Sequence, residues 1–135
     1  MTVYISFATH NTEPVIAEVL IHPENKSHTN IGMSIVLTCV GYGVPLPALT
    51  WKHNEAVVQN GSQFSINEYI VTESQSTATF LLSTLEVCNS ELEDAGNFSC
   101  HSLNALGNEV YTSVLTVNLG GEYILTKCVT LLLNM

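Results

Sequence analysis

The sequence predicts an all-β fold, and three observations support this prediction. In the run that ends at Cys39, Leu37 and Cys39 share one parity, and in the run that ends at Cys100, Phe98 and Cys100 do the same. Side chains alternate faces along a strand, so each run has one buried side. No stretch of useful length has helical periodicity. The core is therefore expected to form between strands.

Three stretches and one corner motif resemble the immunoglobulin family. Residues 32–39 (GMSIVLTC) are similar to its G-x-S-x-x-L-x-C strand, and residues 43–51 (GVPLPALTW) to its G-x-P-x-P-x-hydrophobic-x-W lead. Residues 100–107 (CHSLNALG) resemble its C-x-A-x-N-x-x-G turn, with Ser102 where alanine is usual. Together with the D-x-G-x-Y-x-C-like segment 94–100, these four motifs come in the right order. Over about residues 13–118 the chain is identified as similar to an I-set immunoglobulin domain.

The resemblance implies a two-sheet Greek-key sandwich held by a Cys39–Cys100 disulfide beside Trp51. It places five side chains in the core: Trp51, Leu37, Leu49, Phe98 and Leu115. One departure concerns Phe98, because the family has tyrosine there and its hydroxyl ties down a corner. We expect that corner to lack one hydrogen bond, which costs about 0.5–1.5 kcal/mol.

The first half of the predicted strands follows from proline and alternation. Residues 13–21 form the first strand, which Pro23 ends or bends, because proline removes a ladder donor. The second strand spans about 31–40. The third spans about 48–54, after the prolines of the preceding loop.

The second half follows from turn signals and β-prone runs. Residues 60–62 (NGS) predict a turn, followed by a strand over 64–72. Residues 77–87 are rich in Thr, Leu, Phe and Val and predict the longest strand, and residues 91–96 predict a short helical turn. The last two strands are expected over 97–102 and 109–118.

The chain divides into an N-terminal extension (1–12), the domain (13–118) and an apolar tail (119–135) outside the sandwich. Residues 1–10 lack a basic segment and a continuous apolar core, so we see no secretory signal and expect a piece of a longer protein. The tail carries Lys127 and is too short to span a membrane. It is a docking segment, the start of something longer, or an artefact of how the chain was defined.

Two further cysteines, Cys88 and Cys128, are compatible with a second bridge. The alternative is that both are unpaired here and that Cys88 pairs elsewhere in a longer chain. Zinc sites use paired C-x-x-C or Cys/His spacings, which neither cysteine has, so no metal site is predicted.

Disulfides persist in oxidising compartments, so the expected Cys39–Cys100 bridge points to an extracellular or cell-surface location. Three asparagines are N-glycan acceptors by pattern: Asn25, Asn60 and Asn97. Alternation places Asn97 and Ser99 on the outer side of their strand. The predicted localisation is therefore an ectodomain.

Charge narrows the range of partners. The chain has three lysines, no arginine and twelve carboxylates, giving a net charge of −9. Phosphate backbones and sulfated sugars bind clustered Lys and Arg, so neither nucleic acid nor heparin is an expected partner. The partner is expected to be another protein or a neighbouring immunoglobulin domain.

The sequence predicts no enzyme: we find no catalytic residues and no cofactor site. The five histidines are scattered, and no glycine-rich phosphate loop follows a strand. Asp94 belongs to the corner motif, and the acidic residues near it are expected to be ordinary solvated carboxylates. Gln63 stands where many relatives have an arginine that pairs with this aspartate, so Asp94 is expected to use backbone donors or Lys52.

Two functional classes remain. The favoured one is a non-enzymatic extracellular recognition module of an adhesion, receptor or matrix protein, and the alternative is an intracellular structural module of a muscle filament. Binding is expected at apolar residues of two loops at one end, which could equally cap the core or pack on a next domain. These residues are Tyr42, Val44, Leu46, Leu103 and Leu106.

Overall fold

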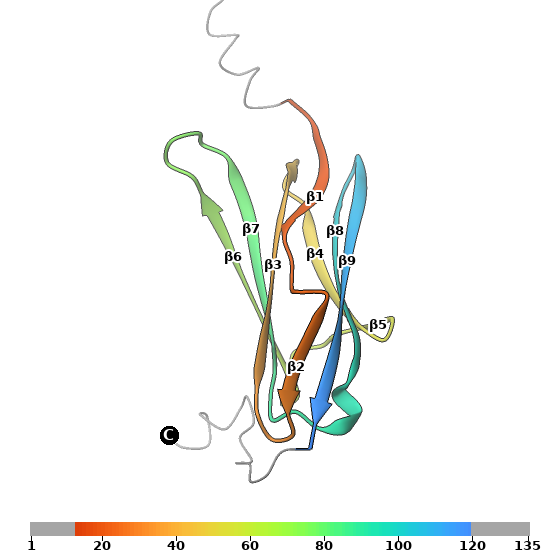
Figure 1. Ribbon diagram of the computed structural model, residues 1–135. Helices are drawn as coiled ribbons and strands as arrows, with labels where there is room; N and C mark the ends of the chain where they lie inside the picture. The colour runs from red at the N-terminus through yellow and green to blue at the C-terminus, as the bar shows by residue number, and fades with distance from the viewer. Residues whose placement is uncertain (1–12, 120–135) are drawn as a thin grey trace, which may run out of the picture.

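Two β-sheets packed face to face make up the computed structural model, which describes residues 13–119 (Figure 1). One sheet has four strands and the other five, which confirms the predicted all-β sandwich. The four-stranded sheet has the order β1 (Val15–Ile21), β3 (Ile35–Val44), β7 (Thr79–Val87) and β6 (Phe64–Thr72). The five-stranded sheet has the order β2 (Lys26–Asn30), β9 (Gly107–Asn118), β8 (Gly96–Asn104), β4 (Ala48–His53) and β5 (Ala56–Val57).

A disulfide joins the two sheets through the centre of the core. Cys39 of β3 and Cys100 of β8 are bonded, with their Cα atoms 6.6 Å apart, and both are fully buried. Trp51 of β4 is buried as well, and its indole Nε1 donates a hydrogen bond of 2.8 Å to Ser83 Oγ on β7. The structure also buries the other side chains expected in the core: Leu37, Leu49, Phe98 and Leu115.

The first two strands of the chain belong to different sheets. β1 pairs antiparallel with β3, and after Pro23 the chain crosses over to form β2, which pairs parallel with β9. The sequence predicted the end of the first strand at Pro23 but missed β2. The residues of β2 (KSHTN) show no alternation of apolar and polar side chains that would predict a strand. The strand forms through its pairing with β9, which is distant in sequence.

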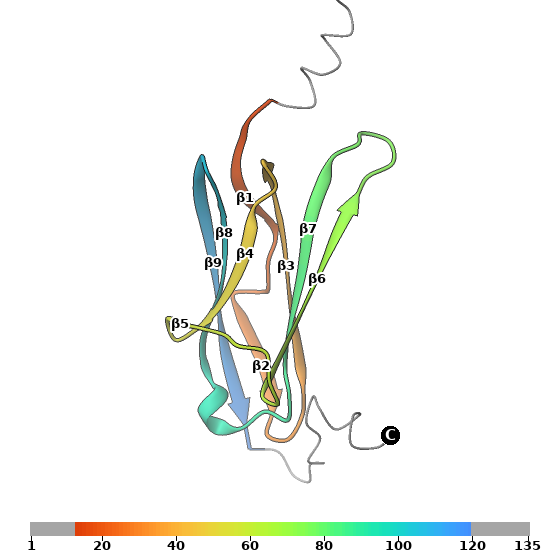
Figure 2. The ribbon, with the colours of Figure 1, turned by 180° about the vertical axis from the view of Figure 1, so that it is seen from behind.

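The second predicted strand begins later than expected, at Ile35 rather than near residue 31. Gly32 has a φ of 87°, and the Met33 N–H donates to the carbonyl of Asn30, so residues 30–33 form a turn. The Gly32 N–H donates to the carbonyl of Ser90. The two-residue strand β5, which projects beyond β4 in Figure 2, was also not predicted. The short helical turn is present as a 3-10 helix, Leu92–Asp94.

Aromatic packing occupies the corner where the family has a tyrosine hydroxyl. The Phe98 ring stacks on His53 at 4.2 Å between centroids, and Phe64 meets it edge-on at 6.0 Å. Beside it, Asp94 accepts hydrogen bonds from the Gln63 side chain (2.6 Å) and the Glu91 backbone (2.8 Å). Glutamine thus bonds the aspartate at the position where arginine is usual.

Asn104 ties three segments together at the opposite pole. Its side-chain Nδ2 donates to the carbonyls of Val15 and Pro45, and its Oδ1 accepts from the N–H groups of Ala17 and Leu106. These four bonds hold β1, the β3–β4 loop and the β8–β9 turn. Asn104, the asparagine of the C-x-A-x-N-x-x-G motif, therefore fixes the relative positions of these three segments.

Ser99 lies on the predicted side of its strand but is more buried than a residue facing solvent. It lies on the outer face of β8, yet it is buried. β8 is a central strand, and Ser99 lies between Lys52 on β4 and Thr112 on β9. A small side chain between larger neighbours is covered by them, and its hydroxyl hydrogen-bonds His101 Nε2 at 2.9 Å.

Candidate interaction surface

The residues predicted to form one apolar spot at the loops are divided between the two faces of the sandwich. Tyr42 and Val44 belong to β3 and Leu103 to β8, so none of them is in a loop. Tyr42 lies between two buried glycines, Gly41 and Gly43, and therefore faces outward from the four-stranded sheet. Leu103 follows buried Ser102 and faces outward from the five-stranded sheet. Because Tyr42 and Leu103 face in opposite directions, the predicted single apolar spot at the loops does not form.

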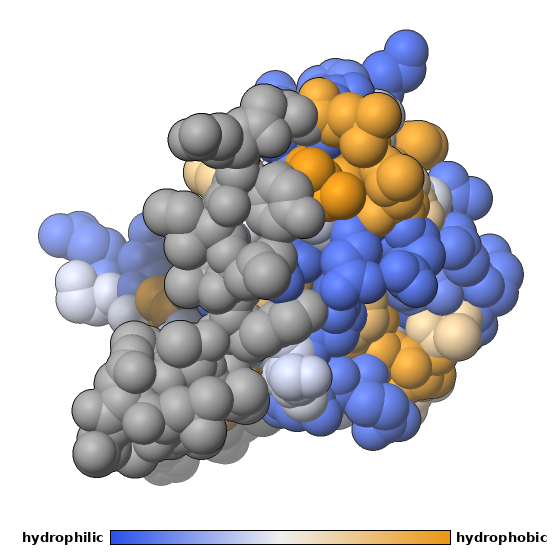
Figure 3. Space-filling model, turned by 90° about the horizontal axis from the view of Figure 1, so that it is seen from below, coloured by the Kyte–Doolittle hydropathy of each residue, from blue (hydrophilic) through white to orange (hydrophobic). Residues whose placement is uncertain are grey.

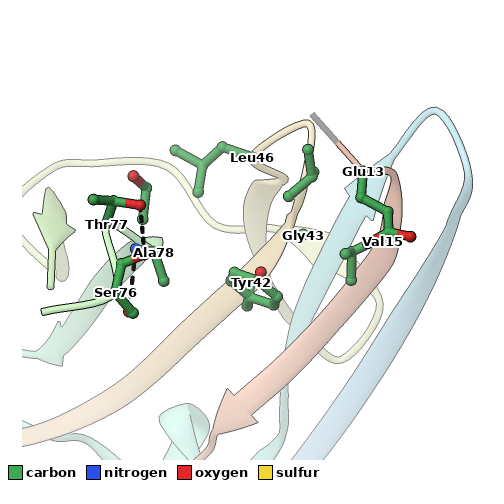
Figure 4. A pocket seen from close by; sticks show the side chains of 10 residues that line it. Glu13, Val15, Tyr42, Gly43, Leu46, Ser76, Thr77 and Ala78 are labelled. Atoms are coloured by element: carbon green, nitrogen blue, oxygen red, sulfur yellow. Dashed lines mark hydrogen bonds between the residues drawn. The ribbon is translucent and has the colours of Figure 1, made fainter. Parts of the chain in front are cut away.

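The other two predicted residues also differ in environment. Leu46 is half-buried and packs against the core, whereas Leu106 is exposed in the β8–β9 turn. Leu46 and Tyr42 line a hollow of about 360 Å³ between Glu13 of the entering chain and Ser76 of the β6–β7 hairpin (Figure 4). Leu46 therefore caps the end of the core, which was the alternative expected for these loop residues.

The outer face of the four-stranded sheet carries an apolar surface that includes Tyr42. Strand pairing aligns two consecutive rows across it, because directly opposed residues share a face. The first row is Ile21, Val40, Leu82 and Tyr69, and the second is Glu18, Tyr42, Phe80 and Val71. We call the seven apolar members of these rows, together with Leu20, the apolar face.

A hollow of about 480 Å³ lies within the apolar face, and only hydrophobic residues line it. These residues are Leu20, Ile21, Val40, Val71, Phe80 and Leu82. Large hydrophobic side chains are exposed elsewhere too, as the view from below in Figure 3 shows. The hollow differs from these exposed side chains in being concave and lined by hydrophobic residues of all four strands of the sheet.

An irregularity in β1 explains why the sequence pattern missed this surface. The register shifts between Val19, which opposes Gly41, and Ile21, which opposes Val40. Two residues of β1 thus correspond to one of β3, as in a β-bulge. Leu20 and Ile21 therefore both line the hollow, although strict alternation assigns consecutive residues to opposite faces.

The charged side chains on the strands of this sheet are all acidic. Glu18 ends the second row on β1, Glu73 follows β6 on the same parity as Val71, and Glu86 of β7 lies two rows below Leu82. The four strands contain neither lysine nor arginine. Lys26 and Lys52, the lysines among residues 13–119, belong to β2 and β4 of the other sheet, and Lys26 lines a separate hollow with Val36 and Thr38 of β3.

The described residues offer no sign of catalytic or metal chemistry. Between residues 13 and 119 no group of three His, Cys, Asp or Glu side chains could hold a metal ion. One histidine is perturbed: burial, followed by the charge of Lys52, lowers the pKa of His101 below its ordinary value. The ring of His101 hydrogen-bonds the Ser99 hydroxyl at 2.9 Å on the outer face of β8.

Comparison with known proteins identifies the family. A family model described as an immunoglobulin domain matches residues 13–104. The chain belongs to the immunoglobulin family. Sidekick-1 of Gallus gallus is 32% identical to this immunoglobulin domain over 92 residues, which are 68% of the chain and 4% of that relative. Neural cell adhesion molecule 1 of Gallus gallus is 28% identical over 98 residues, which are 73% of the chain and 8% of that relative.

Solved structures share the fold. Titin domain M7 superposes with a TM-score of 0.64 at 14% identity, covering 78% of this chain and 97% of that one. A chain from the complex of Dpr2 and DIP-Theta immunoglobulin domains superposes with a TM-score of 0.65 at 19% identity, covering 78% of this chain and 33% of that one. The immunoglobulin prediction is confirmed, the I-set type is consistent with these relatives, and the family is non-enzymatic. The chain spans less than a tenth of the length of the curated relatives above.

The remaining predicted positions lie on the surface or outside the described residues. Asn25, Asn60 and Asn97 are all exposed. Cys88 is buried at the end of β7, and its predicted partner Cys128 lies outside the described residues, as does the tail from residue 120. Among residues 13–119, no helix has the length and apolarity needed to cross a membrane.

Proposed function

We propose that this immunoglobulin domain is an extracellular protein-recognition module, one domain of a longer adhesion-type protein. The observation that carries the proposal is the fully buried Cys39–Cys100 disulfide at the centre of the core. Such bonds persist in oxidising compartments and are rare in the cytosol. Neural cell adhesion molecule 1, a relative by sequence, is an adhesion protein by name. The exposed asparagines Asn25, Asn60 and Asn97 are compatible with glycan attachment.

The competing function is an intracellular structural module. Titin domains share the fold, but at 14–21% identity they carry no argument about function. The two proposals differ in one physical requirement, because a cytosolic module must remain folded with its cysteines reduced. Dependence on the bridge therefore separates them.

Reduction of the bridge tests the proposal. The bridge closes a loop with a sequence separation of 61 residues, and in the chain-entropy model it contributes roughly 4 kcal/mol. Small domains have about 5–15 kcal/mol of stability in total, so its loss is expected to leave a marginal domain. We expect urea unfolding, followed by Trp51 fluorescence, to show a loss of about that size after reduction.

The same measurement in a Cys88→Ala/Cys128→Ala background is the control, because only Cys39 and Cys100 can respond there. A similar loss in both backgrounds supports the extracellular function. A reduced domain as stable as the oxidised one would favour the intracellular module instead.

A further inference from the structure

We propose that the apolar face docks a protein segment whose hydrophobic side chains are flanked by lysine or arginine. The inference rests on the proposed recognition function and names the surface that serves it. Three features of the four-stranded sheet carry it: the contiguity of its apolar rows, the hollow between them and the sign of the charges around them.

Contiguity comes from the register of the sheet. In the two rows, every outward side chain from β3, β7 and β6 is hydrophobic, and the next row down is polar, with Thr38, Thr84 and Asn67. Tyr69 and Val71 on the edge strand β6 are 54% and 44% exposed. An apolar surface with a polar border, of the kind found here, is typical of protein interaction sites.

The hollow gives the surface a shape that can select a partner. The bulge in β1 places both Leu20 and Ile21 along one wall, and Val71 and Phe80 line the hollow as well. Phe80 is held by its contact with Tyr42, 5.3 Å away between ring centroids. A protruding aliphatic or aromatic side chain fits such a concave apolar site, because buried anchors in pockets dominate binding energy.

The charges determine which partner is favoured. Glu18 and Glu73 border the apolar face, Glu86 lies one row beyond its polar border, and no lysine or arginine lies on the four strands. Lys26 of β2 lies near that polar border, so the carboxylates outnumber one cation there. A second copy docked through the same face would bring like charges together, which disfavours self-association. A segment with Lys or Arg beside its anchors would instead meet carboxylates. The apolar contacts supply most of the affinity, and the carboxylates select and orient the partner.

The test uses the oxidised full chain, labelled with ¹⁵N, and two synthetic peptides. One peptide alternates Leu and Val with Lys, and the other replaces each Lys by Glu. We expect the lysine peptide to shift the amide resonances of β3, β6 and β7 and to bind at least tenfold more tightly than the glutamate peptide. Equal affinity for both peptides, no binding, or shifts confined to β4, β8 and β9 would each overturn the proposal.

Variants locate the contact. Val71→Thr/Leu82→Thr is expected to weaken binding of the lysine peptide at least tenfold, whereas Val114→Thr, an equally exposed valine on β9, is expected to leave it unchanged. Dispersed spectra verify that each variant is folded. If the double variant binds like the parent chain, the apolar face is not the site.

Two other occupants give distinct results. A second copy would produce concentration-dependent shifts of the apolar face without peptide, and residues 120–135 would produce shifts of that face when they are removed. Either result would overturn the proposal of an external cationic segment. Neither would affect the reduction test, so failure here and failure of the extracellular function are distinguishable.

Discussion

Two buried serines show how single hydroxyls act in opposite ways in this core. Ser83 accepts the Trp51 indole hydrogen bond, and both partners are buried. Ser102 is equally buried, but among the described residues its hydroxyl has no hydrogen-bond partner. A buried polar group costs free energy when it is unpaired and little when it is paired. The family resemblance places alanine at position 102, which agrees with this cost.

Substitution of the two serines by alanine is expected to change stability in opposite directions. Ser83→Ala leaves the Trp51 N–H without its acceptor and should cost about 1–3 kcal/mol. Ser102→Ala removes an unpaired hydroxyl and should gain about 1 kcal/mol. Urea denaturation of both variants measures the difference. Equal losses would mean that Ser102 is hydrogen-bonded in solution.

At the scale of elements, the turn between the 3-10 helix and β8 depends on Gly96. Gly96 has a φ of 133°, a region that side chains rarely adopt. An added Cβ would overlap the side-chain amide of Asn54, whose Oδ1 accepts a hydrogen bond from the N–H of Asn97 at 2.9 Å. The strand that carries Cys100 therefore begins at a position that only glycine suits.

Gly96→Ala is expected to destabilise the domain by about 1–3 kcal/mol through backbone strain. Gly61→Ala is the matched control, because a Cβ at that position meets no atom within 4 Å. Thermal unfolding followed by circular dichroism compares the two. A neutral Gly96→Ala would show that the Asn54 turn moves away without cost.

At the scale of the whole molecule, the disulfide bridges and attached sugars report whether the chain passed through the secretory pathway. The proposed function predicts a bridge between Cys39 and Cys100, and the sequence further predicts one between Cys88 and Cys128 and sugars at the exposed acceptors Asn25, Asn60 and Asn97. Each feature forms in the secretory pathway. Material from a secretory host should therefore carry them together.

Intact-mass measurement before and after reduction and deglycosylation counts these features. We expect the mass change of two bridges and of at least one glycan. Peptide mapping after digestion assigns the bridges, and Asn97→Gln serves as a control for the sugar on β8. A mass showing one bridge would remove the Cys88–Cys128 pairing, and an unglycosylated product would remove the sugars.

The sequence by itself determined the all-β class, because alternation can be read within one strand. Its short motifs carried the resemblance to the immunoglobulin family, and that resemblance implied the sandwich, the Cys39–Cys100 bridge and the packing of Trp51. Tertiary structure alone decided the parallel pairing of β2, the bulge that turns Leu20 and Ile21 to one side, and the separation of Tyr42 from Leu103. Each of these depends on which distant strand lies alongside, because pairing and register are set by partners that are far away in sequence.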